Sequence, residues 1–138
     1  RMRMMILYQI ACKEGGLVVG TGNKVEDFGI GFFTKYGDGG VDISPIADLT
    51  KTEVRELAEF YQVNQNILKA PPTDGLWKEE KTDEDQIGAS YEELEWAMGY
   101  SYTRELNERE KEVLDIYKKL NELNQHKIMP IPVCKIPK

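Results

Sequence analysis

The sequence contains few of the residues that bind zinc or form disulfides, and it has no long apolar run. One histidine and two cysteines occur among 138 residues, and Cys12 and Cys134 lie near opposite ends without a metal-ligand spacing. This composition argues against a zinc site and a disulfide framework. Together with the lack of a signal-peptide pattern, it favours a cytoplasmic protein with free thiols. No apolar run approaches the ~20 residues that span a bilayer, so we expect no membrane partner.

Positive charge is also scarce. The 18 lysines and arginines face 24 aspartates and glutamates, which leaves a formal net charge of −6. We therefore expect no nucleic-acid partner held by an overall positive field, and any bound anion must be held by local groups. With 41% hydrophobic and 30% charged residues, the chain has the composition of a globular domain. Its length corresponds to one domain or to one piece of a domain.

The first twenty residues predict a helix followed by a strand. Apolar residues recur at three- and four-residue intervals from Met2 to Ile10 and a glycine pair follows, which predicts a helix over residues 1–14. Because this pattern begins at once with Arg1 rather than Met, we expect the chain to begin inside a larger protein. The wholly apolar run Leu17–Gly20 predicts a buried strand of a parallel sheet, and helix, turn and strand together indicate the α/β class.

Turn and capping signals divide the rest of the chain. Seven of the 12 glycines fall between Gly20 and Gly40, among aromatic residues, which predicts a short helix near 25–34 and an exposed loop at 36–40. The polar segment 71–89 is predicted to be a long loop, and the proline-rich end from residue 128 is predicted to be extended. Further helices are predicted at about 51–61, 64–69, 90–98 and 103–124.

Two candidate groups follow the predicted strand, at the edge of the sheet where open α/β folds bind ligands. Thr21 offers a hydroxyl there, although an ordinary strand-to-helix turn has the same composition, and no Walker A loop is present. Glu26 offers a carboxylate suited to Mg²⁺, which takes oxygen ligands and shares them with phosphates. The alternative for Glu26 is an acidic residue in the first turn of a helix, which is our interpretation of Asp27.

A second set of candidates lies in turns or carries positive charge. Lys35 suits a phosphate or a carboxylate and Asp38 suits a hydroxyl or amide donor, on either side of a glycine-rich turn; a surface hairpin is the alternative. Lys51 lies in the first turn of its predicted helix, where the dipole disfavours a cation unless an anion binds. Thr73 presents a hydroxyl after two prolines, as a cap or turn residue also would.

The last candidates have ordinary explanations as well. Arg3 on the first predicted helix is typical of a solvated surface residue, and His126 with Lys127 follows the longest predicted helix, where basic residues are favourable. Several anion-competent groups nevertheless collect at loops of a negatively charged chain. This pattern suggests a small ligand that carries phosphate and binds with Mg²⁺.

The run Phe-Phe-Thr-Lys-Tyr-Gly-Asp-Gly-Gly at residues 32–40 is the most specific motif of the chain. With this run and several further segments in order, the chain resembles the NAD synthetases that use ammonia. Many relatives carry Asp-His after the threonine that matches Thr21, where this chain has Gly22, Asn23 and Lys24. The segments that match, in order, are residues 1–4, 18–21 with Glu26, 31–42, 45, 49–51, 72–74, 82–85, 87–88 with 90–91, and 126–127.

The resemblance implies a fold and an activity. The fold would be α/β, with a Rossmann-like parallel sheet flanked by helices as in the N-type ATP pyrophosphatases, whose class is adenine nucleotide alpha-hydrolase-like, usually as a homodimer. Residues 1–138 would be the carboxy-terminal part of one synthetase domain, and the family's Ser-Gly-Gly-X-Asp-Ser pyrophosphate loop would precede Arg1. This ligase would use ATP to adenylate the nicotinate carboxylate of deamido-NAD. Ammonia, free or released from glutamine, would then displace AMP to give NAD.

The resemblance also implies roles for single residues. Thr21 and Thr73 would contact ATP, and Lys51 would contact its phosphates. Glu26 would bind Mg²⁺. Two alternatives stay open: a truncated or inactive nucleotide-binding module, and another amide synthetase of the ATP pyrophosphatase type. The residues that would bind deamido-NAD are Arg3, Lys35, Asp38, His126 and Lys127, of which Lys35 and Asp38 would place the substrate carboxylate for the reaction.

Overall fold

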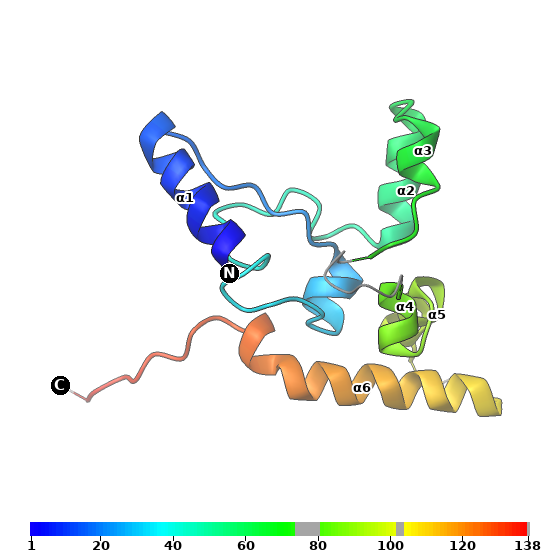
Figure 1. The fold of residues 1–138 in the computed structure, drawn as a ribbon. Helices are drawn as coiled ribbons and strands as arrows, with labels where there is room; N and C mark the ends of the chain where they lie inside the picture. Colours follow the sequence, from blue (N-terminus) through cyan, green and yellow to red (C-terminus); the bar gives the residue numbers. More distant parts are fainter. Residues whose placement is uncertain (74–80, 102–103, 138) are drawn as a thin grey trace.

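The computed structural model describes residues 1–73, 81–101 and 104–137, and its regular structure in these ranges is helical (Figure 1). The elements are α1 (Met2–Glu14), the π-helix η1 (Lys24–Gly29), α2 (Lys51–Phe60), α3 (Gln65–Leu68), α4 (Asp83–Ile87), α5 (Tyr91–Gly99) and α6 (Glu108–Ile128).

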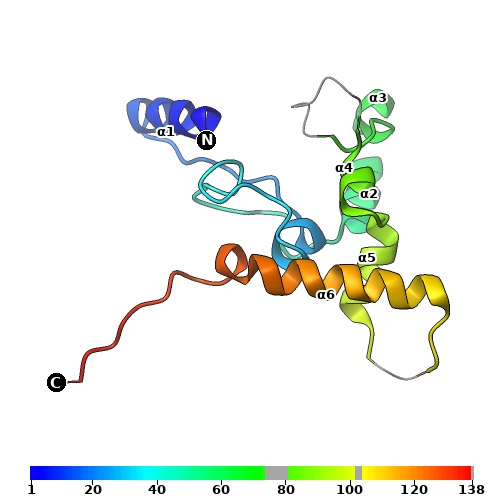
Figure 2. The same cartoon turned by 60° about the horizontal axis from the view of Figure 1, so that its bottom comes forward.

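The core lies where α5, α6 and η1 meet. α6 runs along one side of the molecule, and α5 packs against its first half (Figures 1 and 2). The longest helix contributes Val113 and Leu114, which are buried, and Tyr117, which packs against the core. The buried apolar side chains of this cluster are Val25, Ile30, Ile87, Ala89, Leu94, Ala97, Val113 and Leu114.

The helices that begin with capping residues form as the sequence predicts. Thr50 and Ser90 accept hydrogen bonds from the backbone N–H groups three residues later, and Glu53 and Glu93 reach back to the cap. These reciprocal bonds satisfy N–H groups that a helix start otherwise leaves without a partner. α2 and α5 are therefore confirmed, as is the short α3 behind its Asn64 cap.

α1 is confirmed as a helix, and Gly15 ends it in the left-handed conformation with φ 64°. Its apolar side chains, however, point to solvent: Met2 is 78% exposed and Ile10 is 53% exposed. The helix lies apart from α5 and α6 in both views (Figures 1 and 2). One connection to the rest runs through Asp42, which accepts hydrogen bonds from the Tyr8 hydroxyl at 3.1 Å and the Val18 N–H at 2.8 Å.

The buried strand predicted at Leu17–Gly20 does not form in the described part of the chain. Pairing there is limited to a parallel bridge between Val19 and Ile43, supported by the Gly20 N–H donating to the Ile43 carbonyl at 2.7 Å. Leu17 and Val19 are 65% and 55% exposed. A buried parallel strand needs neighbours along its edges and cover on both faces, and the described residues supply a neighbour on one edge alone.

Two segments also differ from the prediction. The predicted loop 71–89 contains α4, whose Thr82 cap exchanges hydrogen bonds with Asp85 in a capping box. The short helix predicted near 25–34 is instead the six-residue η1. The prediction overlooked α4 because Asp occupies the position where Glu or Gln usually completes this motif.

The longest helix starts and ends later than predicted. Asn107 caps it, whereas the predicted start at residue 103 lies outside the described residues. The helix continues to Ile128, so that His126 and Lys127 lie in its last turn rather than beyond it. Basic groups in a last turn interact favourably with the helix dipole.

Cys12 and Cys134 are free and exposed. Within residues 1–73, 81–101 and 104–137, no helix combines the length and apolar character that crossing a bilayer requires.

Candidate active site

The π-helix η1 carries two acidic side chains of the candidate site. Asn23 caps it, since its side-chain oxygen accepts from the backbone N–H groups of Val25 at 3.1 Å and Glu26 at 3.0 Å. The Ile30 N–H donates to the Val25 carbonyl at 2.9 Å, five residues back, which is the spacing of a π-helix. Single π-turns are frequent at functional sites, and this one sets the direction of Glu26.

Side chains from three elements converge on the Glu26 carboxylate. Asn23 Nδ2 donates to Glu26 Oε2 at 2.6 Å, and the Tyr91 hydroxyl of α5 donates to Glu26 Oε1 at 2.9 Å. Lys51 Nζ of α2 lies 3.7 Å from Glu26 Oε2 and 4.7 Å from the centre of the Tyr91 ring. We call Asn23, Glu26, Lys51 and Tyr91 the Glu26 cluster. Its members link η1, α2 and α5 around one partly buried negative charge.

The electrostatics of the Glu26 cluster follow from burial. Tyr91 is fully buried, and this burial, reinforced by the neighbouring Glu26 carboxylate, raises the pKa of its hydroxyl above the ordinary value. The hydroxyl therefore stays protonated and donates. The side chains of Lys51 and Glu26 are 24% and 17% exposed, so their attraction is screened less than that of a surface pair. The cation in the first turn of α2 thus has a negative partner within the chain.

Asp27 lies next to Glu26 in η1. Burial first, and then the charges of Glu26 and Asp38, raise the pKa of Asp27 to about 7. A Cβ on Gly22 would lie 1.8 Å from Asp27 Oδ2, so the carboxylate occupies the space above that glycine. This contact gives a physical reason for a glycine after Thr21. The sequence position of Asp27 indicated only an acidic residue in the first turn of a helix. In the structure its carboxylate also packs against Gly22.

A pocket of about 240 Å³ opens on the other side of Asp27. Its walls come from the segment 27–44 and from the end of α6 with the start of the extended tail. The charged side chains of its wall are those of Asp27, Lys35 and Lys127, and Phe33 and Tyr36 add aromatic surface. We call this the lysine pocket. Two cations and two aromatic rings suit an anionic, partly planar ligand.

The two lysines of the pocket are held by backbone carbonyls. Lys127 Nζ donates to the carbonyls of Gly31 at 2.9 Å and Phe33 at 2.8 Å, and burial lowers its pKa. Lys35 Nζ donates to the carbonyl of His126. These bonds cross between the glycine-rich segment and the last turn of α6. The lysine pocket therefore joins parts of the chain that are more than 90 residues apart.

The glycine-rich turn folds around Asp38. Its Oδ1 accepts a hydrogen bond from the Thr34 N–H at 3.0 Å, and the Gly37 N–H donates to the Thr34 carbonyl at 2.8 Å. Asp38 is exposed. Its charge contributes to the raised pKa of Asp27 and partly offsets the lowering of the Lys127 pKa by burial. The loop predicted at 36–40 is confirmed as a turn.

The structure thus divides the predicted site residues into groups. Glu26 and Lys51 meet in the Glu26 cluster, and Lys35 and Lys127 meet in the lysine pocket, beside which Asp38 lies. His126 is exposed and contributes its carbonyl. Arg3, Thr21 and Thr73 are exposed, and they are not among the residues that line the lysine pocket.

The Glu26 cluster offers a metal ion one carboxylate. Among the residues that the structure describes, no group of three His, Cys, Asp or Glu side chains is placed to hold one. Mg²⁺ in phosphate chemistry commonly takes one or two carboxylates together with substrate phosphates. Glu26 accepts one bond at each oxygen and keeps further acceptor sites. It therefore fits a magnesium ion shared with phosphate and does not fit an all-protein cage.

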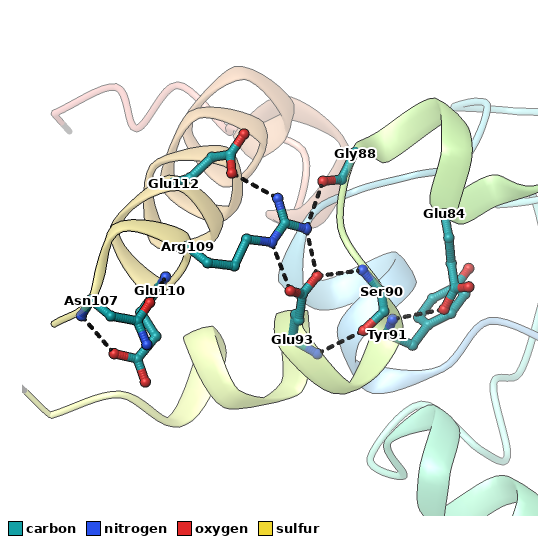
Figure 3. Close-up of polar contacts among 9 residues, drawn as sticks. All are labelled: Glu84, Gly88, Ser90, Tyr91, Glu93, Asn107, Arg109, Glu110 and Glu112. Atoms are coloured by element: carbon teal, nitrogen blue, oxygen red, sulfur yellow. Dashed lines mark hydrogen bonds and ion pairs between the residues drawn. The ribbon is translucent and has the colours of Figure 1, made fainter.

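A network behind the Glu26 cluster fixes α5 on α6 (Figure 3). Arg109 donates to both oxygens of Glu93 at 2.7 Å and to the Gly88 carbonyl at 3.1 Å. These bonds hold the pKa of Glu93 below its ordinary value. The Tyr91 N–H donates to Glu84 Oε1 at 2.9 Å, which ties the first residue of α5 to α4. Tyr91 is thereby anchored through its backbone as well as through its ring.

Sequence reasoning missed Asn23, Asp27 and Tyr91 as parts of the site. Asn23 had a recognisable signal, because asparagine before a helix is a common cap. Tyr91 lies inside the capping box that predicts α5, but a motif of four residues does not reveal a partner 65 residues away.

Comparisons with known proteins place the chain in a family. Residues 1–131 match the profile of the NAD synthase family. The NH(3)-dependent NAD(+) synthetase of Methanococcoides burtonii is 54% identical over 95 residues, which are 69% of this chain and 35% of that protein. The protein of the same name from Alkaliphilus metalliredigens is 44% identical over 131 residues, which are 94% of this chain and 50% of that protein.

A solved structure shares the fold. The NMN synthetase of Francisella tularensis superimposes with a TM-score of 0.84 at 32% identity, over 98% of this chain and 53% of that one. The chain spans about half the length of the Alkaliphilus relative and a third of the Methanococcoides one. The helical arrangement described above is therefore that of part of this class of synthetases.

Proposed function

The chain belongs to the NAD synthase family, and from this premise we propose that it serves the ATP-dependent amidation of deamido-NAD to NAD with ammonia. The family match over residues 1–131, with relatives named NH(3)-dependent NAD(+) synthetase, is the observation that carries the proposal. The two adjoining sites, one around Glu26 and one around the lysine pocket, support a reaction that brings two anionic substrates together. We further propose the Rossmann-like parallel sheet for the complete fold.

The proposed reaction has two steps. A carboxylate oxygen of the nicotinate group attacks the α-phosphorus of ATP, and the bond to pyrophosphate breaks. Ammonia then attacks the carboxyl carbon, the bond from that carbon to the AMP oxygen breaks, and the attacking nitrogen gives up one proton to leave the amide. The first step turns a poor leaving oxygen into a good one. The protein contributes by placing the reactants and by offsetting negative charge as they approach.

ATP is assigned to the side of the Glu26 cluster. We propose that Lys51 contacts the ATP phosphates, since its ammonium lies over the Tyr91 ring and its side chain is 24% exposed. We also propose that Thr21 and Thr73 contact ATP. Glu26 would hold Mg²⁺, and the bound ion would supply positive charge next to the phosphates.

Deamido-NAD is assigned to the lysine pocket. Lys35 and Lys127 would pair with its acidic groups, and Asp38 with Lys35 would place the nicotinate carboxylate for the reaction. Arg3 and His126 complete the proposed set, although the His126 imidazole and the Arg3 guanidinium lie outside the pocket wall. The aromatic rings of Phe33 and Tyr36 offer surface for a planar base or nicotinate ring.

A second candidate substrate is the mononucleotide, nicotinate mononucleotide. The solved structure that superimposes at a TM-score of 0.84 is named NMN synthetase. The chemistry at the nicotinate carboxylate is the same for both substrates, so the lysines and Asp38 would keep their roles. The two candidates differ in whether a second nucleotide must be bound.

Paired turnover assays test the proposal. The protein at its natural length is incubated with ATP, Mg²⁺, ammonium and either deamido-NAD or nicotinate mononucleotide, and AMP, pyrophosphate and the amide product are quantified. Amide formed in equal amounts with AMP supports the proposal, and the ratio of kcat/KM values selects the substrate. Consumption of neither substrate defeats it in favour of an inactive binding module.

We also propose a homodimer in the cytoplasm, supplied with ammonia that is either free or released from glutamine. Sedimentation of the purified protein at micromolar concentration tests the homodimer, and a mass of one chain would contradict it. Replacing ammonium with glutamine in the turnover assay tests the nitrogen donor.

A further inference from the structure

Tyr91 combines burial with two contacts that a core residue does not require. It is fully buried, which accounts for its ring. Its hydroxyl, however, donates to the Glu26 carboxylate at 2.9 Å, and its ring lies 4.7 Å from the Lys51 ammonium. The two groups that it touches are those assigned above to Mg²⁺ and to the ATP phosphates. A single side chain thus contacts both charged members of the Glu26 cluster.

The distances indicate what fixes each charge. Lys51 Nζ lies 3.7 Å from Glu26 Oε2, which is too long for a hydrogen bond. Two groups therefore hold the ammonium: the Glu26 carboxylate as an ion pair, and the ring face of Tyr91 through attraction between a cation and a π system. Glu26 is fixed at its two oxygens by different groups, Asn23 and Tyr91. Removal of the Tyr91 hydroxyl would leave one oxygen without its protein donor.

The anchoring of Tyr91 makes it a suitable support. Its N–H is bonded to Glu84, and the neighbouring Ser90 and Glu93 form the capping box of α5 (Figure 3). Arg109 clamps Glu93 onto α6 through two bonds of 2.7 Å. A rigid second layer of this kind orients the groups that touch a metal ion and keeps them in a productive geometry.

We propose that Tyr91 is a positioning residue that holds the Glu26 carboxylate and the Lys51 ammonium in register for a metal-bound triphosphate. This inference rests on the proposed function, because it assigns Tyr91 a role toward the ligands named there. Tyr91 touches neither reactant and acts through the side chains of Glu26 and Lys51.

Metal binding in the presence of ATP tests the role directly. Tyr91→Phe keeps the ring and removes the hydroxyl, in the protein at its natural length. Mn²⁺ replaces Mg²⁺ as the probe, and its binding to the protein with ATP is followed by electron paramagnetic resonance. Loss of a supporting group of this kind weakens metal affinity by roughly 10–100-fold, and we expect at least a tenfold rise in the Mn²⁺ dissociation constant.

Tyr100→Phe is the matched control. Its hydroxyl also makes one hydrogen bond, to the Arg104 carbonyl at 2.9 Å, but it lies at the far end of α5 from Glu26. We expect its Mn²⁺ dissociation constant to stay within twofold of wild type. Equal Mn²⁺ binding by wild type and Tyr91→Phe, whatever the change in Tm, would overturn the inference and leave Tyr91 an ordinary core residue.

A second background removes the dependence on folding. In Glu26→Ala, Tyr91 has no carboxylate to position, so adding Tyr91→Phe should cost no further Mn²⁺ affinity. A further loss of tenfold on that background would also overturn the inference. Wild-type protein that binds no Mn²⁺ with ATP would defeat the proposed function together with the inference. The two results above, by contrast, would overturn the role of Tyr91 and leave the proposed function standing.

Discussion

The Glu26 cluster and the lysine pocket hold their charges in different ways. In the Glu26 cluster, side chains from three elements bond to one another, and the central carboxylate is largely shielded from water. In the lysine pocket, Lys35 and Lys127 bond to backbone carbonyls along an open wall. The first arrangement is fixed before a ligand arrives, whereas the second can exchange a carbonyl for a ligand oxygen.

This difference has a consequence for function. Side chains that fix one another can present charge to a phosphate without reorganising, which is the condition for electrostatic stabilisation during a reaction. Lysines of this kind bond to backbone carbonyls when the pocket is empty, and they can rotate toward an anion when one binds. We therefore expect substitutions in the two sites to affect the two substrates separately.

The largest effect should come from Asp38→Asn. The asparagine can still accept the Thr34 N–H bond through its oxygen, so the turn should persist while the negative charge is lost. We expect kcat/KM for deamido-NAD to fall by about 10²-fold or more, which is the size of loss seen when a group that stabilises charge at a reacting centre is removed. The Tm should stay within about 2 °C of wild type. Steady-state kinetics and thermal melts measure both.

Asp115→Asn provides the control for this charge change, since Asp115 is an exposed acid on α6. It should leave kcat/KM unchanged. Wild-type turnover by Asp38→Asn would remove the aspartate from the mechanism and leave the lysine pocket as a binding surface alone.

Lys51→Met should have the next largest effect, which is a loss of stability. The substitution leaves the Glu26 carboxylate, 17% exposed, without its cation. We expect a loss of about 1–2 kcal/mol in the free energy of unfolding, between the values for exposed and buried pairs. Urea unfolding measures it, with Lys119→Met on the exposed face of α6 as control. An increase in stability would show that the dipole of α2 outweighs the pairing with Glu26.

The smallest effect concerns pH. Arg109 holds the pKa of Glu93 below its ordinary value in the folded chain. A lowered folded-state pKa adds stability above the unfolded-state pKa of about 4.3, and this gain is lost as the pH falls through the folded-state pKa. Arg109→Met should therefore lower Tm more at pH 7 than at pH 3. Thermal melts at both pH values measure the difference in Tm between wild type and Arg109→Met. An equal difference at pH 7 and pH 3 would mean that Arg109 acts through its Gly88 bond alone.

Some elements could be predicted from the sequence because their causes are local. The capping boxes at Thr50 and Ser90 specify helix starts through residues three positions apart, and α2 and α5 begin where they predict. The Leu17–Gly20 strand had no such local cause. It depended on neighbours, and in the described residues Ile43 alone pairs with it.

The candidate site divides in the same way. The residue types of Glu26 and Lys51 could be singled out from their positions, but their contact could not, because it depends on how α2 packs beside η1. Tyr91 and Glu26 are 65 residues apart. The lysine pocket likewise forms only when the last turn of α6 reaches the glycine-rich segment, as the bond from Lys127 to Gly31 records.

The separation of the two sites is tested most directly by calorimetric titration of two variants with two ligands. Lys51→Met and Lys127→Met, in the protein at its natural length, are each titrated with ATP plus Mg²⁺ and with deamido-NAD. We expect Lys51→Met to lose at least tenfold in ATP affinity and to keep deamido-NAD affinity within twofold, and Lys127→Met to do the reverse. Weakening of the same ligand by both variants would contradict the account, because the two lysines would then belong to one site.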